Sequence, residues 1–236
     1  MERSKNVKAI IFDFDGVLVI SEFLHYKAFA KALQEMGGQM DWSDYAANFI
    51  GVPDKVTAQE SLKRSGLDHS PAAVDTLLRR KTQIFDEELP HGIIVAEGLT
   101  EVIRELHKTY YLAIASGAFR HQIIPILQYH QIQNAFVTVV GQDDVTKGKP
   151  DPEPYLLAWR RIREATNTDI QQGQCLVVED ALPGIEAARR AGMPSVAIAT
   201  YFPPSAFPDG QIVLSQLKDL LKEETWRLID KTFFGK

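Results

Sequence analysis

Five polar side chains that can bind a cation or a phosphoryl group follow short apolar runs of the chain. In chain order they are Asp13, Asp15, Ser116, Glu179 and Asp180. The runs before them, residues 7–12, 110–115 and 175–178, lack alternation, which is typical of strands buried on both faces of a parallel sheet. Because ligands bind at the carboxyl ends of such strands, the sequence predicts that the five side chains share one site.

Carboxylates gathered at one edge of a sheet repel one another unless a cation lies among them. Carboxylate oxygens are ligands that suit Mg²⁺, which usually keeps water and substrate phosphate oxygens in its shell. Lys149, in the stretch Lys147-Gly148-Lys149-Pro150-Asp151-Pro152, is expected to add a positive charge at the same edge. A metal, a lysine and a small hydroxyl can neutralise and orient a phosphoryl dianion for in-line attack. The predicted chemistry is phosphoryl transfer with Mg²⁺ as cofactor.

Each motif also has a purely structural explanation when it is taken alone. Aspartate and glycine are turn residues, and Glu179-Asp180 after a strand can simply cap the next helix. Ser116-Gly117 suits any turn at a strand end, and Lys149 beside a proline is by default a solvated loop residue. Their joint order along the chain is what favours a functional site.

Helical periodicity fills the segments between the apolar runs. Leu99, Val102, Ile103 and Leu106 are spaced i, i+3, i+4 and i+7. A nearly equal spacing near the C-terminus involves Leu214, Leu217, Leu220 and Leu221. Further strands are expected over 135–140 and 195–199. Alternating strands and helices predict an α/β fold with a Rossmann-like parallel sheet.

Residues 20–92 break this alternation. They contain helical patterns, expected over 21–36, 42–49, 54–65 and 71–88, and no convincing buried strand. We therefore expect a mostly helical cap domain, residues 20–92, inserted after the first strand. Residues 1–19 and 93–236 form the expected α/β core.

Composition excludes several classes of protein. The 236 residues are 45% hydrophobic and 24% charged, as in ordinary globular proteins, and the net charge is −5. The charge disfavours a broadly basic nucleic-acid surface, and no apolar run approaches the ~20 residues that span a bilayer. The single cysteine, Cys175, fits a reducing compartment. We expect a soluble, cytoplasmic protein with neither nucleic acid nor membrane as partner.

The motifs resemble those of the haloacid dehalogenase superfamily. The four matching segments, in the order of the family's motifs, are residues 10–18, 115–117, 147–152 and 177–185. The resemblance extends from about Val7 to Tyr201, and the helical insertion is similar to the cap of the β-phosphoglucomutase-like subfamily.

This resemblance implies a role for each acidic residue. Asp13 would be the nucleophile that forms an aspartyl-phosphate, and Asp15 the general acid and then the base. Asp13, the backbone carbonyl of Asp15 and the Glu179-Asp180 pair would hold Mg²⁺. Asp180 would be a direct ligand, and Glu179 would bind either directly or through water.

The resemblance also implies which residues bind the substrate. Ser116 and the backbone N–H groups from Gly117 onward would bind phosphoryl oxygens, and Lys149 would pair with both the phosphate and Asp13. Three further candidates for substrate contacts are His25, Lys55 and Arg120. The family's dehalogenating and phosphonate-cleaving members lack an acid at the position of Asp15, so its presence favours phosphate-ester chemistry.

Asp54 bears on which phosphate ester is used. It stands where β-phosphoglucomutases have an arginine that grips the substrate's distal phosphate, and a carboxylate would repel that group. The sequence therefore favours a phosphatase, a monomer or weak homodimer, acting on a small phosphorylated metabolite such as a sugar phosphate. A hexose-phosphate mutase and a non-catalytic metabolite-binding relative are the alternatives.

Overall fold

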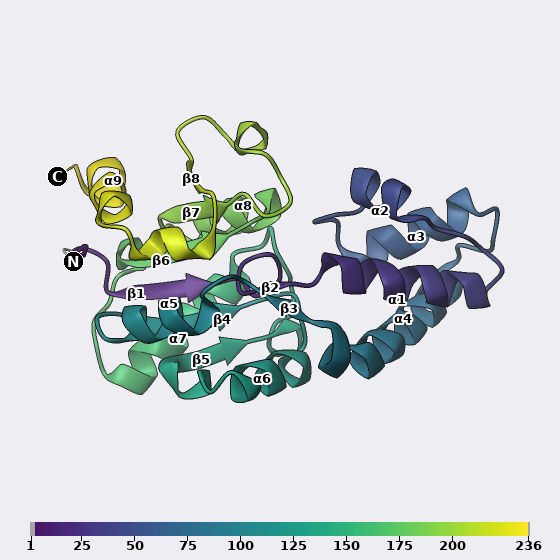
Figure 1. The fold of residues 1–236 in the computed structure, drawn as a ribbon, viewed down its shortest axis with the longest axis horizontal. Coiled ribbons are helices and arrows are strands. Elements are labelled where there is room, and N and C mark those ends of the chain that lie inside the picture. Colours follow the sequence, from purple (N-terminus) through teal and green to yellow (C-terminus); the bar gives the residue numbers. More distant parts are fainter. Residues whose placement is uncertain (1–2, 236) are drawn as a thin grey trace. The chain divides into compact units, whose positions relative to one another are not determined.

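The computed structural model describes residues 3–235, except the side chains of residues 90–92 (Figure 1). The chain divides into two compact units. Unit 1 comprises residues 1–19 and 95–236, and unit 2 comprises residues 20–94. The side chains at the expected end of the insertion, around residue 92, thus lie outside the described part.

A six-stranded parallel sheet forms the centre of unit 1, in the order β5-β4-β1-β6-β7-β8. Its strands are β1 (Ala9–Phe12), β4 (Tyr111–Ala115), β5 (Phe136–Val140), β6 (Cys175–Glu179), β7 (Ser195–Ile198) and β8 (Ile212–Leu214). The order reverses at β1, which lies between β4 and β6. Such a reversal opens a crevice for ligands at the carboxyl ends of the strands.

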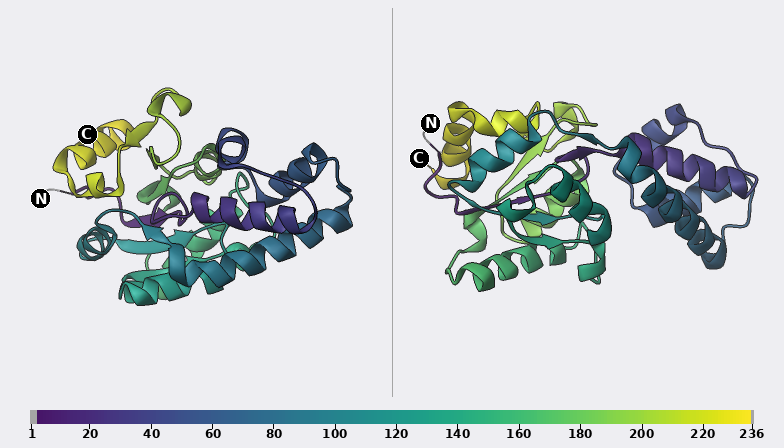
Figure 2. Two further views of the ribbon diagram at one scale, coloured as in Figure 1. Left: turned by 45° about the vertical axis from the view of Figure 1, so that its right-hand side comes forward. Right: turned by 60° about the horizontal axis from the view of Figure 1, so that its bottom comes forward.

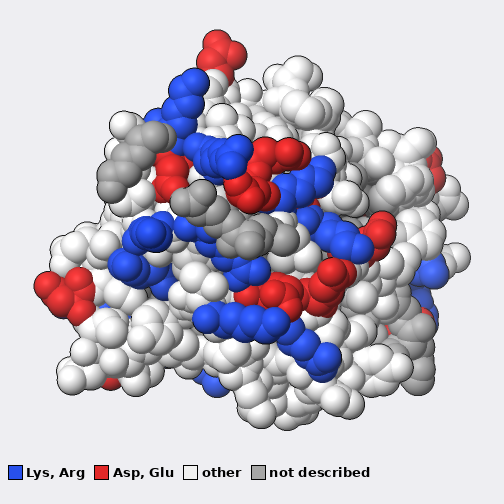
Figure 3. Space-filling model, turned by 60° about the vertical axis from the view of Figure 1, so that its left-hand side comes forward, with Lys and Arg blue, Asp and Glu red and all other residues white. Residues whose placement is uncertain are grey.

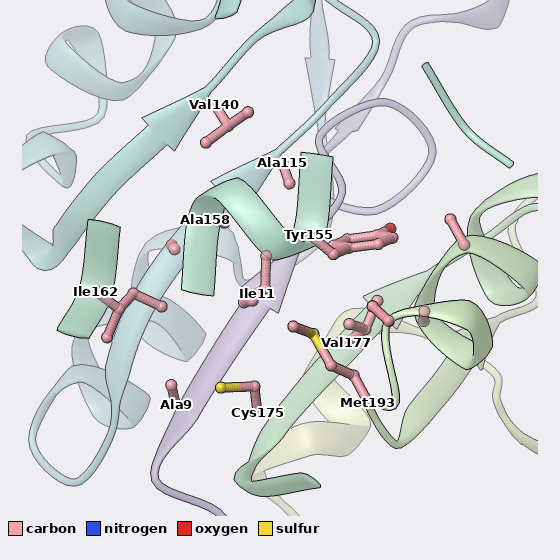
Figure 4. Packing of buried hydrophobic residues seen from close by; sticks show 14 of the residues in the cluster. Ala9, Ile11, Ala115, Val140, Tyr155, Ala158, Ile162, Cys175, Val177 and Met193 are labelled. Carbon is pink, nitrogen blue, oxygen red and sulfur yellow. The ribbon is translucent and has the colours of Figure 1, made fainter. Parts of the chain in front are cut away.

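Helices cover both faces of this sheet, which explains why its inner strands are apolar without alternation. The helices are α5 (Leu99–His107), α6 (Arg120–Tyr129), α7 (Glu153–Thr166), α8 (Leu182–Arg190) and α9 (Glu223–Phe234). Figure 2 shows α5 and α9 on the face opposite α7. Tyr155, Ala158 and Ile162 of α7 pack in one cluster with Ile11 and Val177 of the sheet (Figure 4). The predicted α/β fold is confirmed.

The C-terminal part of the sheet differs from the expectation. Leu214, assigned to a helical pattern, ends β8, and residues 217–221 form a 3₁₀ segment before α9. A three-residue edge strand is too short for its periodicity to be distinguished from one helical turn. Ile212 instead pairs with Val196 of β7, a contact that sequence spacing does not reveal.

Unit 2 is helical. It contains α1 (Glu22–Glu35), α2 (Trp42–Asn48), α3 (Asp54–Arg64) and α4 (Pro71–Gly92). The side chains of Asp41 and Ser70 accept hydrogen bonds from backbone N–H groups of Asp44 and Ala73, which caps α2 and α4. The two-residue strands β2 (Val19–Ile20) and β3 (Ile94–Val95) pair where the chain passes between the units.

Within residues 3–235, no helix is both long and apolar enough to cross a membrane. On the face shown in Figure 3, Lys and Arg side chains are interspersed with Asp and Glu side chains. That pattern is typical of a solvated surface, and the expectation about nucleic acid stays a prediction.

Candidate active site

The carboxyl ends of β1, β4 and β6 carry the predicted acidic residues and the serine. Asp13 directly follows β1, and its backbone N–H donates to the carbonyl of Val178 at 2.9 Å. Ser116 follows β4, and Asp180 follows β6. One carboxylate oxygen from each of Asp13, Glu179 and Asp180 lies within 4.8 Å of the others. Parallel pairing of the central strands therefore gathers groups that are far apart in the sequence.

Lys149 lies between two of these carboxylates. Its Nζ is 2.9 Å from Asp13 Oδ1 and 2.6 Å from Glu179 Oε1. Only 13% of the side chain of either Lys149 or Asp13 is exposed, so this pairing is little screened by solvent. Lys149, which by its sequence context alone is a solvated loop residue, thus supplies the positive charge of the cluster.

Glu179 is held by four hydrogen bonds. Its Oε1 accepts from Lys149 Nζ and from the hydroxyl of Tyr155, both at 2.6 Å. Its Oε2 accepts from the backbone N–H groups of Asp180 and Ala181, at 3.0 and 3.1 Å. A Cβ on Gly184 would lie 1.7 Å from Oε1, so only glycine leaves room for this carboxylate. Glu179 is therefore a fixed, buried anchor.

Gly16 leaves room for the carboxylate of Asp180, as Gly184 does for that of Glu179. Its φ of +74° favours glycine, and a Cβ there would lie 1.9 Å from Asp180 Oδ2. The hydroxyl of Thr200 donates to the carbonyl of Gly16 at 2.5 Å, which ties the loop after β1 to the segment after β7. The glycine of the Asp-Phe-Asp-Gly segment thus serves both a backbone turn and a close approach.

Burial and neighbouring charges shift the proton equilibria of the site. Burial, supported by Glu179 and Asp15, raises the pKa of Asp13 to about 7, although Lys149 acts in the opposite direction. Burial disfavours the ammonium of Lys149, yet Asp13 and Glu179 outweigh it and raise the pKa of that lysine. Lys149 therefore keeps its positive charge, and this charge compensates the negative charge of the Asp13 carboxylate only in part.

The donor set fits a hard divalent cation. Three carboxylates face one ammonium, and all the available ligand atoms are oxygens, as Mg²⁺ prefers. Both oxygens of Glu179 accept hydrogen bonds from the protein, and Asp13 and Asp180 complete the group of three carboxylates around the candidate metal site. A cation here would also offset the burial that raises the pKa of Asp13.

Ser116 and Gly117 offer donors beside this cluster. The buried Ser116 Oγ accepts from the backbone N–H of Ala118 at 3.0 Å, which leaves its proton to donate to an incoming oxygen. A Cβ on Gly117 would meet nothing within 4 Å, so the space above this residue is open. A phosphoryl group can approach the backbone N–H groups of this turn.

Arg120 is engaged elsewhere in unit 1. Its guanidinium lies 3.6 Å from Asp144 Oδ2 and donates to the carbonyl of Val139 at 3.4 Å. Asp144 also pairs with Arg161 at 2.6 Å. These contacts brace the end of β5, and a substrate contact by Arg120 stays a prediction.

His25 and Lys55 belong to unit 2. His25 stacks on Phe85 at 4.3 Å, and its Nδ1 lies 2.8 Å from Nζ of Lys81. Lys55 is exposed in the first turn of α3. Substrate contacts by His25 and Lys55 stay predictions.

Three residues of these networks were not singled out from the sequence: Tyr155, Thr200 and Lys81. Tyr155 and Lys81 occupy the apolar stripes of their helices, Tyr155 with Ala158 and Lys81 with Leu77. A polar residue on a buried stripe is a usable signal, because it needs a partner. Thr200 follows an apolar strand like the predicted residues, but its partner is a backbone carbonyl, which no sequence pattern marks.

Comparison with known proteins agrees with this architecture. Residues 10–198 match the family described as haloacid dehalogenase-like hydrolases. A fructose-1-phosphate phosphatase of Escherichia coli is 31% identical over 189 residues, 80% of this chain and 95% of that protein. A phosphorylated carbohydrates phosphatase of Thermotoga maritima is 29% identical over 191 residues, 79% of this chain and 82% of that protein.

Solved structures extend the likeness to the fold. The structure of CbbY from Rhodobacter sphaeroides with phosphate has a TM-score of 0.78 at 24% identity and covers 94% of this chain and 99% of that one. A putative β-phosphoglucomutase of Thermotoga maritima has a TM-score of 0.69 at 23% identity and covers 91% and 97%. The match of residues 10–198 to the family and the 31% identical relative from Escherichia coli show that the chain belongs to the haloacid dehalogenase-like hydrolase family.

Proposed function

We propose that this protein is a Mg²⁺-dependent phosphatase that hydrolyses a small phosphorylated metabolite through an aspartyl-phosphate. One observation carries the proposal: Lys149 bridges Asp13 and Glu179, and an oxygen of Asp180 lies within 4.8 Å of the same carboxylates. A buried carboxylate that pairs with a cation at one oxygen and adjoins a second cation site can meet an anionic substrate without prohibitive repulsion.

The proposed reaction has two displacements. An oxygen of Asp13 attacks phosphorus, the bond from phosphorus to the ester oxygen breaks, and Asp15 gives its proton to that leaving oxygen. A water molecule then attacks the phosphorus while Asp15 takes its proton, the bond from phosphorus to the Asp13 oxygen breaks, and phosphate leaves with the Asp13 carboxylate regenerated. Ser116, the N–H groups after it and Lys149 hold the phosphoryl oxygens. When bound, Mg²⁺ supplies positive charge that neutralises the phosphoryl oxygens and Asp13.

The substrate class follows from the relatives and from Asp54. Relatives that act on fructose 1-phosphate and on phosphorylated carbohydrates support a sugar phosphate or a similar small ester. Asp54 is half-exposed and pairs with Lys81 at 2.6 Å, so it offsets a positive charge in unit 2 rather than adding one. A mutase needs cations for a second phosphate, and this pairing disfavours that alternative. His25, Lys55 and Arg120 are the side chains we propose for contacts with the rest of the substrate.

The test is phosphate release from a panel of phosphorylated metabolites in the presence of Mg²⁺. Release that is lost both in Asp13→Asn and after EDTA treatment, with folding intact, is the expected result. Conversion of one sugar-phosphate isomer into another that depends on a bisphosphate primer would replace the proposal with the mutase. A folded protein that binds these compounds without turning any over would be a binding relative instead.

A further inference from the structure

Tyr155 is a buried polar side chain that the reaction scheme above does not use. It lies in the first turn of α7 and is 0% exposed, within the apolar cluster of Ala158 and Ile11 (Figure 4). Its hydroxyl nevertheless donates a 2.6 Å hydrogen bond to Glu179 Oε1. Phenylalanine would fill the same apolar space without a polar atom, so the hydrogen bond to Glu179 is what the tyrosine hydroxyl adds.

One oxygen of Glu179 receives both Tyr155 and Lys149. The Lys149 Nζ lies 2.6 Å from Oε1 and 4.9 Å from the centre of the Tyr155 ring. Tyr155 therefore contacts the lysine with its ring and the lysine's carboxylate partner with its hydroxyl. Since two backbone N–H groups hold Oε2, the carboxylate has about as many donors as lone-pair sites.

The second donor on Oε1 has a consequence for Lys149. The backbone N–H groups of Asp180 and Ala181 hold only Oε2, so the position of Oε1 depends on its own two donors, and the flexible stem of Lys149 does not set that position by itself. The Tyr155 hydroxyl fixes where Oε1 lies and takes up part of its negative charge. Lys149 is then shared with Asp13, 2.9 Å away, rather than drawn wholly to Glu179.

We propose that Tyr155 is a positioning residue that, through Glu179, holds the Lys149 ammonium on Asp13. The 2.6 Å hydrogen bond from the Tyr155 hydroxyl to the carboxylate oxygen Oε1 of Glu179 carries this assignment, since a carboxylate accepts and the phenol donates. The kinetic effect of this arrangement rests on the proposed phosphatase function, whereas its geometry does not.

The test compares Tyr155→Phe with Tyr110→Phe. Tyr110 is also buried in unit 1, stacks on Trp226 and donates its hydroxyl to the carbonyl of Ser4 at 3.2 Å, so its variant loses a similar bond away from the site. We expect Tyr155→Phe to lower kcat for phosphate release about tenfold with KM within about twofold. Tyr110→Phe should keep kcat within about twofold of the wild type.

A second readout does not depend on turnover. In the crystal structure of Tyr155→Phe, we expect the separation of Lys149 Nζ and Asp13 Oδ1 to lengthen from 2.9 Å to beyond hydrogen-bond distance. An unchanged Lys149 in that structure, or equal losses of kcat in the two variants, would overturn the proposal. If the wild type releases no phosphate, the proposed function fails, and the crystal structure alone decides the role of Tyr155.

Discussion

At the scale of single residues, Asp13 combines two opposing requirements. The nucleophile of the proposed reaction must be ionised, yet Asp13, which we propose for that role, is buried beside Glu179 and Asp15, and burial raises its pKa to about 7. Lys149 compensates in part from 2.9 Å away. A divalent cation would compensate the rest of the negative charge of Asp13. The burial that raises the pKa of Asp13 therefore also favours a bound cation beside this carboxylate.

The raised pKa of Asp13 predicts a pH-dependent stability. Between pH values of about 4 and 7 the folded protein holds a proton on Asp13 that the unfolded chain has released, so the free energy of unfolding falls as pH rises through this window. We expect Asp13→Asn, which carries no charge, to be more stable than the wild type at pH 8 and nearly equal to it at pH 5. Urea unfolding of both proteins in EDTA measures this.

The control for that experiment is Asp219→Asn. Asp219 is a buried aspartate of unit 1 whose pKa is lowered, because hydrogen bonds from Lys222 and the backbone outweigh its burial. Its variant should therefore lose stability relative to the wild type at neutral pH, the opposite sign from Asp13→Asn. A stability difference for Asp13→Asn that is the same at pH 5 and pH 8 would contradict the assignment.

At the scale of elements, β6 and α8 must approach each other closely for the site to exist. Glu179 ends β6, and Gly184 lies in α8, where its missing side chain leaves space for the carboxylate. An alanine normally stabilises a helix relative to glycine by about 1 kcal/mol. Here the packing of strand against helix reverses that preference.

Gly184→Ala is expected to be destabilising. The new Cβ would lie 1.7 Å from Glu179 Oε1, so either the buried glutamate or α8 must move, at a cost of about 1–3 kcal/mol in the free energy of unfolding. Phosphate release should fall more than ~10-fold, because Lys149 loses its anchor. Gly173→Ala, where a Cβ meets nothing within 4 Å, should change stability by less than about 0.5 kcal/mol. Equal effects of the two changes would rule out the packing explanation.

Unit 2 holds a lysine between helices. The Lys81 side chain is 4% exposed, and its Nζ pairs with Asp54 at 2.6 Å and lies about 5 Å from the ring centres of Phe29 and Phe85. It joins α4 to the first turn of α3 and to α1. Such an ammonium is costly to leave without a charged partner.

Asp54→Ala is therefore expected to destabilise the protein by about 1–2 kcal/mol, whereas Lys81→Met, which removes the buried charge itself, should be nearly neutral. Glu35→Ala breaks the exposed pair of Glu35 with Arg80 and should cost less than about 1 kcal/mol. Chemical denaturation followed by circular dichroism measures all three. A larger loss in Lys81→Met than in Asp54→Ala would contradict this account.

At the scale of the whole molecule, the proposed metal site belongs to only one of the two units. Asp13, Glu179 and Asp180 all lie in unit 1. A ligand that binds the folded state and not the unfolded chain stabilises the part that carries its site. Of the three tryptophans, Trp42 lies in unit 2, while Trp159 and Trp226 lie in unit 1.

Mg²⁺ is accordingly expected to raise the unfolding temperature of unit 1. In a Trp42→Phe variant, tryptophan fluorescence reports unit 1 alone, and a Mg²⁺ concentration 100 times its Kd should add about 2.7 kcal/mol, or several degrees. Asp180→Asn should abolish the shift, because it removes one of the three carboxylates of the proposed metal site. A shift that persists in Asp180→Asn would place the cation elsewhere.

The sequence by itself determined the fold class, the strand ends of the site and the family. Strands buried on both faces need apolar residues at every position, and the residues that follow them reach one edge whatever the helices do. These are local patterns, so Asp13, Ser116 and Asp180 are found at strand ends as expected. The short edge strand β8 was missed because three residues carry too little periodicity.

Only the tertiary structure decided which side chains pair. Tyr155 reaches Glu179 across 24 residues of sequence and Lys81 reaches Asp54 across 27, and Arg120 turns to Asp144 rather than standing as an isolated cation. Such pairings depend on how helices pack, which fixes distances to within a hydrogen bond. A sequence specifies which residues must be buried, but the partner of a buried polar group is chosen by packing alone.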